Sequence, residues 1–393
     1  MSGAFHLEKT SATSQARAGE LLTSHGIIKT PVFAPVGSQA CVKALTPDDL
    51  KEAGTGLVLA NCYHLYLRPG IETISALGGL HRFMGWDGPL LTDSGGFQIF
   101  SLAPLARVSD EGVSFRSHID GGVHHITPEE AVRFQEALGA DIIMALDECP
   151  PSDADLERVD TATARTKQWA ERCLKAHQRT DQMLFGIVQG GLSVTLRQQA
   201  ASEMAALDFP GYAIGGLSLG EPKSATMEMV AATAACLPAE RPRYLMGVGA
   251  PEDILEAISL GIDIFDSVLP TRVARNGALF TRPGRINIRN SAFSRQDDPV
   301  EADCPCYTCR RFSAAYLHHL FHAGELLAYR LASIHNVSFM NRLLGDIRAA
   351  ILANRFEALR ASFLDSYHQT DEGIRQEQKQ RWLAKRRFRP PEW

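Results

Sequence analysis

Short apolar runs recur along the chain, and each is followed by polar or glycine-rich positions and then by a helical pattern. A continuous apolar run of this length predicts a strand buried on both faces, which is typical of a parallel sheet covered by helices. Eight such runs are present, at residues 31–36, 57–60, 90–91, 142–146, 183–188, 212–214, 244–246 and 262–265. The pattern therefore predicts strands that alternate with helices.

Start and stop signals mark several of the intervening helices. Thr46 precedes a proline, as an N-cap does before a proline at the first helical position. Residues 127–130 form a capping box, and Gly139 is placed to end the helix that they open. A further helix is expected to start at Pro251 and to close at Gly261. This alternation favours an α/β fold of the TIM type, a closed (β/α)₈ barrel, over an open doubly wound sheet.

Two segments depart from this rhythm. Residues 113–126 alternate in polarity and predict an inserted hairpin. From residue 279, alternating isoleucines, a cysteine cluster and a helical pattern over about 312–334 predict a zinc-binding subdomain packed on the barrel, with another helix beyond His335. We therefore divide the chain into a barrel (1–278), a zinc-binding subdomain (279–345), a C-terminal helix (346–374) and a basic tail (375–393). The tail is expected to be a solvated or frayed end.

The composition narrows the possible partners. At 393 residues with 45% hydrophobic content, the chain can bury a large core, although its length would also fit two ordinary domains. A net charge of −5 and a pI near 6.2 exclude a protein that coats nucleic acid non-specifically, so any RNA contact must be a local patch. The N-terminus lacks a signal-peptide pattern and no run of 18 apolar residues occurs, so we expect a soluble, cytoplasmic protein.

The cysteines fall into two groups, because three of the eight lie together and the others are isolated. The clustered three are too close for a pair of unstrained disulfides but suit one tetrahedral ion, and zinc is the expected metal. With four protein ligands the site would be closed and structural. The alternative is a redox-active thiol cluster, and the isolated cysteines are expected to be free core thiols. The candidate ligands are Cys304, Cys306 and Cys309 with one of His318, His319, His322 and His335.

Polar residues and glycines follow the predicted strands, at the end of a barrel where active sites lie. Asp266 is also followed by a proline-containing loop that brings Arg272 and Arg275 close, which pairs a possible nucleophile with a possible phosphate clamp. Each of these residues taken alone could instead be an ordinary turn or helix cap. The strand-end residues singled out for the site are Asp93, Asp147, Gln189, Gly216, Gly247 and Asp266.

The stretch after Asp93 adds a flat apolar face. Two glycines let backbone N–H groups approach a ligand closely, and Phe97 behind them can stack. Together with the carboxylates and the glutamine amide, these groups make a pocket suited to a purine. A guanine edge offers N–H donors to a carboxylate and a carbonyl oxygen to an amide or a backbone N–H, whereas adenine would fit badly.

Several motifs resemble those of bacterial-type tRNA-guanine transglycosylase, the queuine tRNA-ribosyltransferase family. They are LTDSGGFQ, FGIVQGG, AIGGL, LMGVG, IFDSVLPTRVARNG and CPCYTC…SIHN, in order between about Phe5 and the helix after His335, and the resemblance does not extend to the basic tail. It implies a homodimeric barrel enzyme of queuosine biosynthesis with a structural zinc ion. Such an enzyme replaces the wobble guanine of tRNAs with GUN anticodons (Asp, Asn, His and Tyr) by a 7-deazaguanine, through a double displacement and a covalent enzyme–RNA intermediate.

The resemblance also implies roles for individual residues. Asp266 is expected to be the nucleophile and Asp93 the general acid/base. The base pocket is expected to comprise Asp93, Ser94, Gly95, Gly96, Phe97, Asp147, Gln189 and Gly216. The expected RNA-binding residues are Gly247, Val248, Gly249, Ala250, Pro251, Glu252, Asp253, Thr271, Arg272, Val273, Ala274 and Arg275. The expected zinc ligands are Cys304, Cys306, Cys309 and His335.

One position bears on the choice of incoming base. Within the family, a bulky side chain shortly after the Gly-Gly-Leu turn implies the small precursor 7-aminomethyl-7-deazaguanine rather than queuine, and here Leu219 holds that position.

Three other functions fit the sequence less well. A non-catalytic, zinc-stabilised tRNA-binding subunit would lack the catalytic carboxylates, but Asp93 and Asp266 are both present. An archaeal-type transglycosylase would carry extra C-terminal RNA-binding domains, and a nucleoside hydrolase would need neither Arg272 and Arg275 nor the zinc subdomain.

Overall fold

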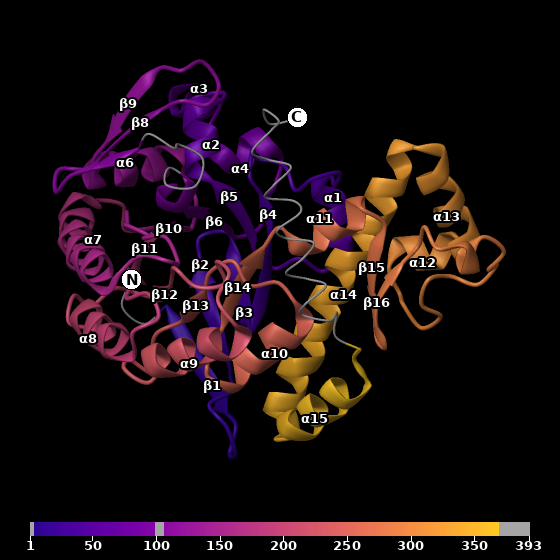
Figure 1. Cartoon of the computed structure of the whole chain (residues 1–393). Helices are drawn as coiled ribbons and strands as arrows, with labels where there is room; N and C mark the ends of the chain where they lie inside the picture. Colours follow the sequence, from indigo (N-terminus) through magenta and orange to yellow (C-terminus); the bar gives the residue numbers. More distant parts are fainter. Residues whose placement is uncertain (1–3, 99–105, 369–393) are drawn as a thin grey trace.

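A closed barrel of parallel strands forms the centre of the molecule (Figure 1). The computed structural model describes residues 4–98 and 106–368. Each barrel strand pairs with the strands that come before and after it along the barrel, and the last pairs with the first to close it, so the predicted (β/α)₈ barrel is confirmed. The strands are β4 (Val32–Gly37), β5 (Val58–Asn61), β6 (Leu90–Asp93), β10 (Ile142–Met144), β11 (Met183–Val188), β12 (Tyr212–Ile214), β13 (Arg243–Leu245) and β14 (Ile264–Ser267).

Helices cover the outside of the barrel, and the predicted caps are present. Both Thr46 and Thr127 accept a hydrogen bond from the third helical N–H and close a capping box, and Gly139 ends its helix in the left-handed region at φ 77°. These helices are α1 (Pro47–Glu52), α2 (Cys62–Leu67), α3 (Ile71–Ala76), α4 (Gly79–Met84), α6 (Pro128–Leu138), α7 (Leu156–Ala176), α8 (Val194–Ala205), α9 (Lys223–Ala234) and α10 (Pro251–Ser259).

An antiparallel sheet that the apolar pattern did not predict closes the barrel where its strands begin. It consists of β1 (Phe5–Thr10), β2 (Arg17–Thr23) and β3 (Gly26–Thr30), and β3 leads directly into β4. Its side chains Phe5, Leu21 and Ile28 are buried in one cluster with the residues that fill the barrel interior. The interior is therefore a packed core with its own cover, and only the opposite end is free for a site.

The predicted inserted hairpin is present between β6 and α6. Strands β8 (Val113–Arg116) and β9 (Val123–Ile126) pair antiparallel, and a short strand, β7 (Arg107–Val108), adds a third member to the sheet.

The C-terminal region differs from the prediction in three respects. Helix α11 (Leu269–Arg275) occupies the segment expected to be a loop. The helix predicted over 312–334 is two helices, α13 (Ala314–Ala323) and α14 (Leu326–Leu352), because Gly324 ends the first in the left-handed region at φ 75°. The helix expected beyond His335 is present as α15 (Phe356–Ser366), but α14 itself continues through His335, and the expected boundary at 345/346 falls inside α14.

Helix α14 joins the C-terminal region to the barrel. It packs against α11 and β4 on one side and against α12 and α13 on the other (Figure 1). The remaining elements here are β15 (Ala278–Thr281), β16 (Gly284–Asn287), the 3₁₀ helix η1 (Ser291–Phe293), α12 (Tyr307–Arg311) and α15 (Phe356–Ser366). The expected basic tail lies outside the described residues. Within residues 4–98 and 106–368, no helix has both the length and the apolar character needed to cross a bilayer.

Candidate active site and metal centre

Asp93 ends β6 and is held by the neighbouring strand. Asn61, its partner in the β5–β6 register, donates its amide N–H to Asp93 Oδ2, and the backbone N–H of Cys62 donates to Oδ1 at 3.0 Å. The orientation of the Asn61 amide is fixed because its oxygen accepts the N–H of His64 at 3.2 Å. The carboxyl group is therefore locked at the end of the barrel.

The surroundings of Asp93 favour its protonated form. Burial raises its pKa to about 8, the N–H of Cys62 acts against this shift, and the negative charges of Asp266 and Asp147 raise the pKa further. These electrostatic effects require the three carboxyl groups to lie near one another, as the positions at strand ends predicted. At neutral pH, Asp93 can thus donate a proton.

Asp266 lies on β14 and has a different set of partners. Its Oδ1 accepts hydrogen bonds from the hydroxyl of Tyr244 at 2.6 Å and from the backbone N–H of Gly247 at 2.8 Å. Burial raises the pKa of Asp266, and these two bonds act against the shift. Among the described residues, none donates a hydrogen bond to Oδ2, and the side chain is half-buried. One oxygen is therefore fixed while the other can attack a ligand.

Asp147 and Gln189 form a polar wall beside Asp93. Gln189 donates its amide N–H to Asp147 Oδ2 at 2.7 Å, and the hydroxyl of Ser94 donates to Oδ1 at 3.4 Å. Burial raises the pKa of Asp147 to about 6, and both hydrogen bonds oppose this shift. The amide oxygen of Gln189 is buried and accepts no hydrogen bond from the described residues. A buried acceptor without a donor is costly, which indicates a place for a ligand N–H group.

Glycines allow the backbone to approach this wall. A Cβ on Gly96 would lie 2.8 Å from the carbonyl oxygen of Asp147, and one on Gly216 would lie 2.3 Å from the amide oxygen of Gln189. Both positions therefore exclude a side chain. Phe97 is 43% exposed and follows Gly96 directly, so its ring is free to stack on a ligand.

The expected RNA-binding residues differ in exposure. Gly247 is exposed, but residues 248–252 are buried, and on α11 so are Thr271 and Ala274. Arg272 is exposed and Arg275 half-buried. These arginines are three residues apart on a helix, and burial followed by the charge of Arg272 lowers the pKa of Arg275. The two positive charges thus share one helical face.

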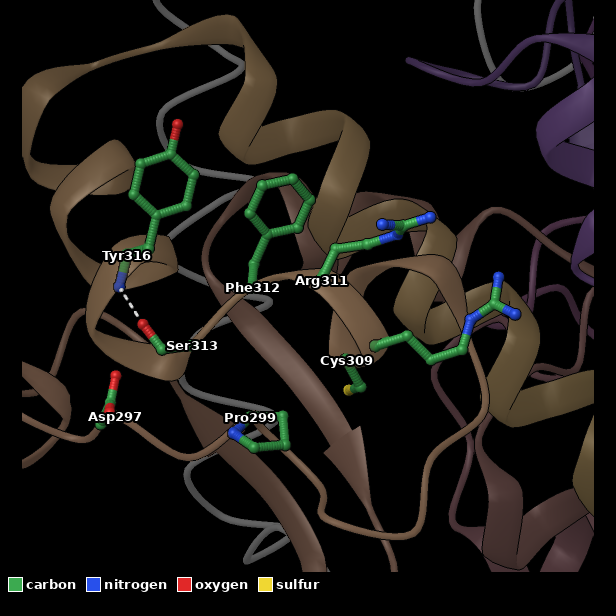
Figure 2. Close-up of a pocket in the computed structure, with 8 residues that line it drawn as sticks. Asp297, Pro299, Cys309, Arg311, Phe312, Ser313 and Tyr316 are labelled. Atoms are coloured by element: carbon green, nitrogen blue, oxygen red, sulfur yellow. Dashed lines mark hydrogen bonds between the residues drawn. The ribbon is translucent and has the colours of Figure 1, made fainter.

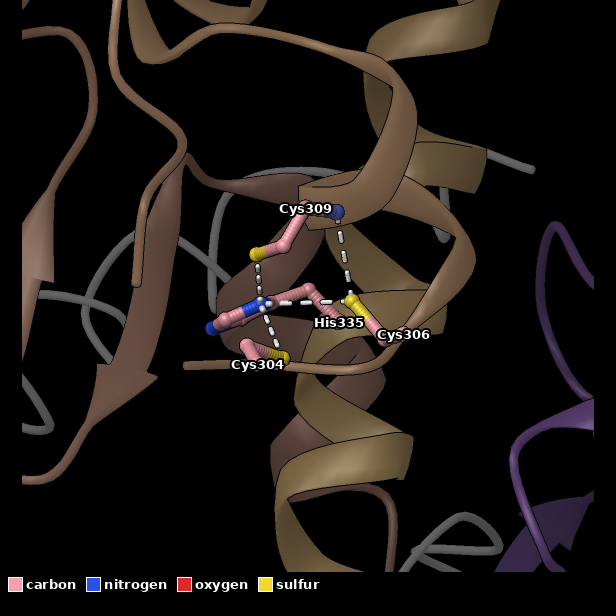
Figure 3. Close-up of side chains that lie close together, drawn as sticks. All are labelled: Cys304, Cys306, Cys309 and His335. Carbon is pink, nitrogen blue, oxygen red and sulfur yellow. Dashed lines mark hydrogen bonds between the residues drawn. The ribbon is translucent and has the colours of Figure 1, made fainter. Parts of the chain in front are cut away.

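The cysteine cluster meets His335 of α14, and all four side chains are buried (Figure 3). Nδ1 of His335 lies 3.8, 3.7 and 3.3 Å from the sulfurs of Cys304, Cys306 and Cys309. Nε2–H of His335 donates to the carbonyl oxygen of Phe280 at 2.7 Å, which leaves the Nδ1 lone pair facing the thiols. The cysteines are free thiols, and this group could hold a metal ion.

An open cavity of about 490 Å³ lies beside the metal centre, since Cys309 is one of its lining residues. Figure 2 shows the side chains that line it. Phe312 and Tyr316 stack on its wall with ring centroids 5.4 Å apart. Arg311 and Asp297 also line it. None of the catalytic candidates contributes to this cavity, so it is separate from the barrel site.

Two residues of the site were not predicted from the sequence. Asn61 follows a predicted strand and could have been recognised from that position, since the other strand-end polar residues were. Tyr244 begins one of the predicted apolar runs and carried no such signal, because its hydroxyl reaches Asp266 from inside the barrel.

Comparison with known proteins gives a consistent result. The family model described as Queuine tRNA-ribosyltransferase matches residues 11–369. A queuine tRNA-ribosyltransferase of Dehalococcoides mccartyi strain BAV1 is 61% identical over 391 residues, which cover 100% of both chains. Proteins of the same name from Pelotomaculum thermopropionicum and Desulforamulus reducens are 53% and 51% identical, over 93% and 92% of this chain and 99% and 98% of theirs.

Proposed function

The chain belongs to the queuine tRNA-ribosyltransferase family and is therefore a pentosyltransferase that acts on tRNA; from this premise we propose that it exchanges the wobble guanine of GUN-anticodon tRNAs for 7-aminomethyl-7-deazaguanine. The tRNAs would be those for Asp, Asn, His and Tyr, and the reaction would be a step in queuosine biosynthesis. We place it in the cytoplasm, where its tRNA substrate is found.

The pair formed by Asp266 and Asp93 carries this proposal. Oδ2 of Asp266 attacks C1′ of the wobble ribose while the N-glycosidic bond breaks, and Asp93 gives its proton to the departing guanine. The incoming base then gives a proton to Asp93 and attacks C1′, which releases Asp266. The pKa of Asp93, raised to about 8, supports its role as the proton donor. The oxygen of Asp266 that accepts no hydrogen bond from the described residues supports its role as the nucleophile.

Recognition of the base is assigned to the polar wall and the glycines. The carboxylate of Asp147 would accept N–H groups from the guanine edge, and Phe97 would stack on the ring. The buried oxygen of Gln189 would gain the donor that it lacks among the described residues. The backbone N–H of Gly216 would donate a hydrogen bond to the carbonyl oxygen of the base.

Leu219 supports the smaller incoming base. Glu221 accepts the backbone N–H groups of Ser218, Leu219 and Gly220, which holds this loop in one conformation with Leu219 half-buried. Leu219→Gly is expected to admit full-sized queuine, and competition of the two bases for labelled tRNA measures this directly. Unchanged selectivity in the variant would remove Leu219 from the specificity determinants.

We assign tRNA binding to α11 and to the exposed backbone near Gly247. Arg272→Ala and Arg275→Ala are each expected to weaken tRNA binding. Each should also lower the slope of log Kd against log salt concentration by about one, as the loss of one phosphate contact would. Binding of the free base should stay unchanged, because neither arginine belongs to the polar wall.

Zinc is the metal that the Cys₃His donor set fits best, and bound there it would stabilise the fold rather than take part in chemistry.

We further propose a homodimer. Apolar side chains exposed on α13 and α14, among them Tyr316 at 39% and Leu326 at 78%, offer a surface for a second copy. Sedimentation equilibrium of the wild type and of Leu326→Glu tests this assignment, since the charge should favour the monomer.

Covalent trapping tests the central step. The wild type is mixed with tRNA, quenched in acid and run on a denaturing gel, and peptide mapping locates the attached RNA. Asp266→Asn should lose both the adduct and guanine exchange. Asp346→Asn is the matched control, since Asp346 is an exposed carboxylate on α14. Attachment elsewhere, or exchange by Asp266→Asn at the wild-type rate, would refute the assignment.

A further inference from the structure

A second group of potential metal ligands lies at the closed end of the barrel, opposite the active site. It consists of His25, His81 and Asp141, whose ligand atoms lie within 4.8 Å of one another. His25 is in the turn between β2 and β3, His81 is on α4, and Asp141 directly precedes β10. Three segments that are distant in sequence therefore meet where the barrel strands begin.

The carboxylate of Asp141 is fixed before any ligand binds. It is 2% exposed, and it accepts the backbone N–H of Leu90 at 2.9 Å and that of His25 at 3.1 Å. A carboxylate oriented in this way between two imidazoles is a typical transition-metal donor set.

The present distances are those of hydrogen bonds and lie near the spacing that one ion requires. Ligands bonded to zinc at the usual bond lengths are about 3.3 Å apart in a tetrahedral site. His25 Nδ1 lies 2.8 Å from Asp141 Oδ1, and His81 Nε2 lies 3.3 Å from Asp141 Oδ2. We propose that His25, His81 and Asp141 form a second metal site, which takes a divalent first-row transition ion such as Zn²⁺ with water completing its coordination.

The site needs one local movement. The rings of His25 and His81 stack at 3.6 Å between centroids with 18° between their planes, so one ion cannot lie in both ring planes. The side chain of His25 is 38% exposed, whereas those of His81 and Asp141 are 14% and 1% exposed. The backbone of the turn is held, because Ser24 donates to the carbonyl oxygen of Asp181 at 2.8 Å. Rotation of the His25 ring would complete the site, and the ion would replace the hydrogen bond that Nε2 of His81 donates to the carbonyl oxygen of Gly88 at 3.1 Å.

The ion would fasten the N-terminal sheet to the barrel. His25 belongs to the sheet that covers the core, whereas His81 and Asp141 belong to the barrel units. A metal bond between them adds a cross-link where the structure otherwise has hydrogen bonds. Hard ions such as Mg²⁺ and Ca²⁺ prefer oxygen ligands and should bind poorly.

Zn²⁺ titration of the purified chain, with its cysteine–histidine centre already loaded, tests the proposal. Isothermal calorimetry should detect one further equivalent, and Mg²⁺ should give none. His25→Gln and His81→Gln should each weaken this second event by at least about tenfold. His6→Gln is the matched control, because His6 is an exposed histidine on β1 of the same sheet. Its titration should match the wild type.

Thermal melting gives a second readout. Added Zn²⁺ should raise the Tm of the wild type and of His6→Gln but not that of His25→Gln, since a ligand stabilises only the state that binds it. The proposal is overturned if the loaded wild type takes up no second equivalent at millimolar Zn²⁺, or if His25→Gln binds it with wild-type affinity. The latter result would leave the three side chains as a hydrogen-bonded cap.

Discussion

Two aspartates at the same barrel mouth differ because of their neighbours. Asp93 accepts hydrogen bonds on both oxygens from Asn61 and Cys62, and burial, together with the charges around it, raises its pKa. Asp266 is half-buried, and both of its donors, Tyr244 and Gly247, bind Oδ1. Environment rather than residue type thus separates the proposed proton donor from the proposed nucleophile.

The raised pKa of Asp93 predicts an alkaline limb in the rate profile. Asp93 is protonated below a pKa of about 8 and loses its proton above it, so kcat/KM for guanine exchange should fall as pH rises through about 8. Because the charge of Asp147 contributes to the shift, Asp147→Asn should move the limb to lower pH. Steady-state assays from about pH 6 to pH 10 measure both effects. A flat profile, or a limb that Asp147→Asn moves upward, would contradict the assignment.

At the scale of residues, the sequence predicted which residue types form the site but not which of them are protonated. Asp93, Asp147 and Gln189 were recognised because they follow predicted strands. The pKa values of the two aspartates depend on burial and on charges from distant strands, which no local pattern contains. Tyr244 could not be recognised for the same reason, since its role depends on the closure of β13 against β14.

Among the elements, the barrel strands were predictable and the C-terminal helices were less so. A buried parallel strand is a continuous apolar run, whereas β1 to β3 mix polar with apolar residues, so their pattern is weak. Gly324 is a single residue within a helical pattern, and its effect as a terminator became clear only from its left-handed backbone. Helix α11 was missed because Pro270 suggested a loop, but proline is favourable in a first turn.

Asn336 of α14 connects the metal centre to α11. Its amide N–H groups donate to the carbonyl oxygens of Pro270 at 2.9 Å and Ala278 at 3.0 Å, and its oxygen accepts the N–H of Phe280 at 2.9 Å. Asn336→Ala should destabilise the fold by about 3 kcal/mol, because it leaves buried groups unpaired. It should also weaken tRNA binding, since the start of α11 loses its anchor.

Asn341→Ala is the control for this prediction. Asn341 lies on the same helix but donates to Ala53 and Thr55 near the start of β5. Urea unfolding should show a loss of stability for both variants, whereas tRNA titration should show a weaker Kd for Asn336→Ala alone. Equal tRNA affinity in the two variants would separate Asn336 from the RNA site.

For the whole molecule, a buried ion pair joins the N-terminal sheet to the barrel. The guanidinium of Arg17 on β2 donates to the carboxylate of Asp263, the residue directly before β14, at 2.9 and 2.5 Å. Asp263 also accepts the backbone N–H of Arg243 at 2.7 Å. The side chains of Arg17 and Asp263 are 3% and 0% exposed. The pair therefore fixes the sheet against the strand that carries Asp266, the proposed nucleophile.

Breaking this pair should be costly, because it leaves a buried guanidinium without its partner. We expect Asp263→Asn to lower the free energy of unfolding by about 3–5 kcal/mol. Asp87→Asn, which breaks the exposed pair with Lys51, should leave it unchanged. Urea denaturation of both variants measures the difference. Similar midpoints for Asp263→Asn and the wild type would show that the sheet does not depend on this contact.

The anchoring of α11 by Asn336 has a consequence for synthesis on the ribosome. All barrel strands, with the two aspartates proposed to be catalytic, are translated before residue 336 emerges, so the barrel can close while the arginine-bearing helix still lacks its support. His335, the adjacent residue, completes the metal ligands at the same moment. A nascent chain would thus acquire the proposed catalytic groups first and its tRNA-binding helix last. Incompletely synthesised chains would therefore not bind tRNA.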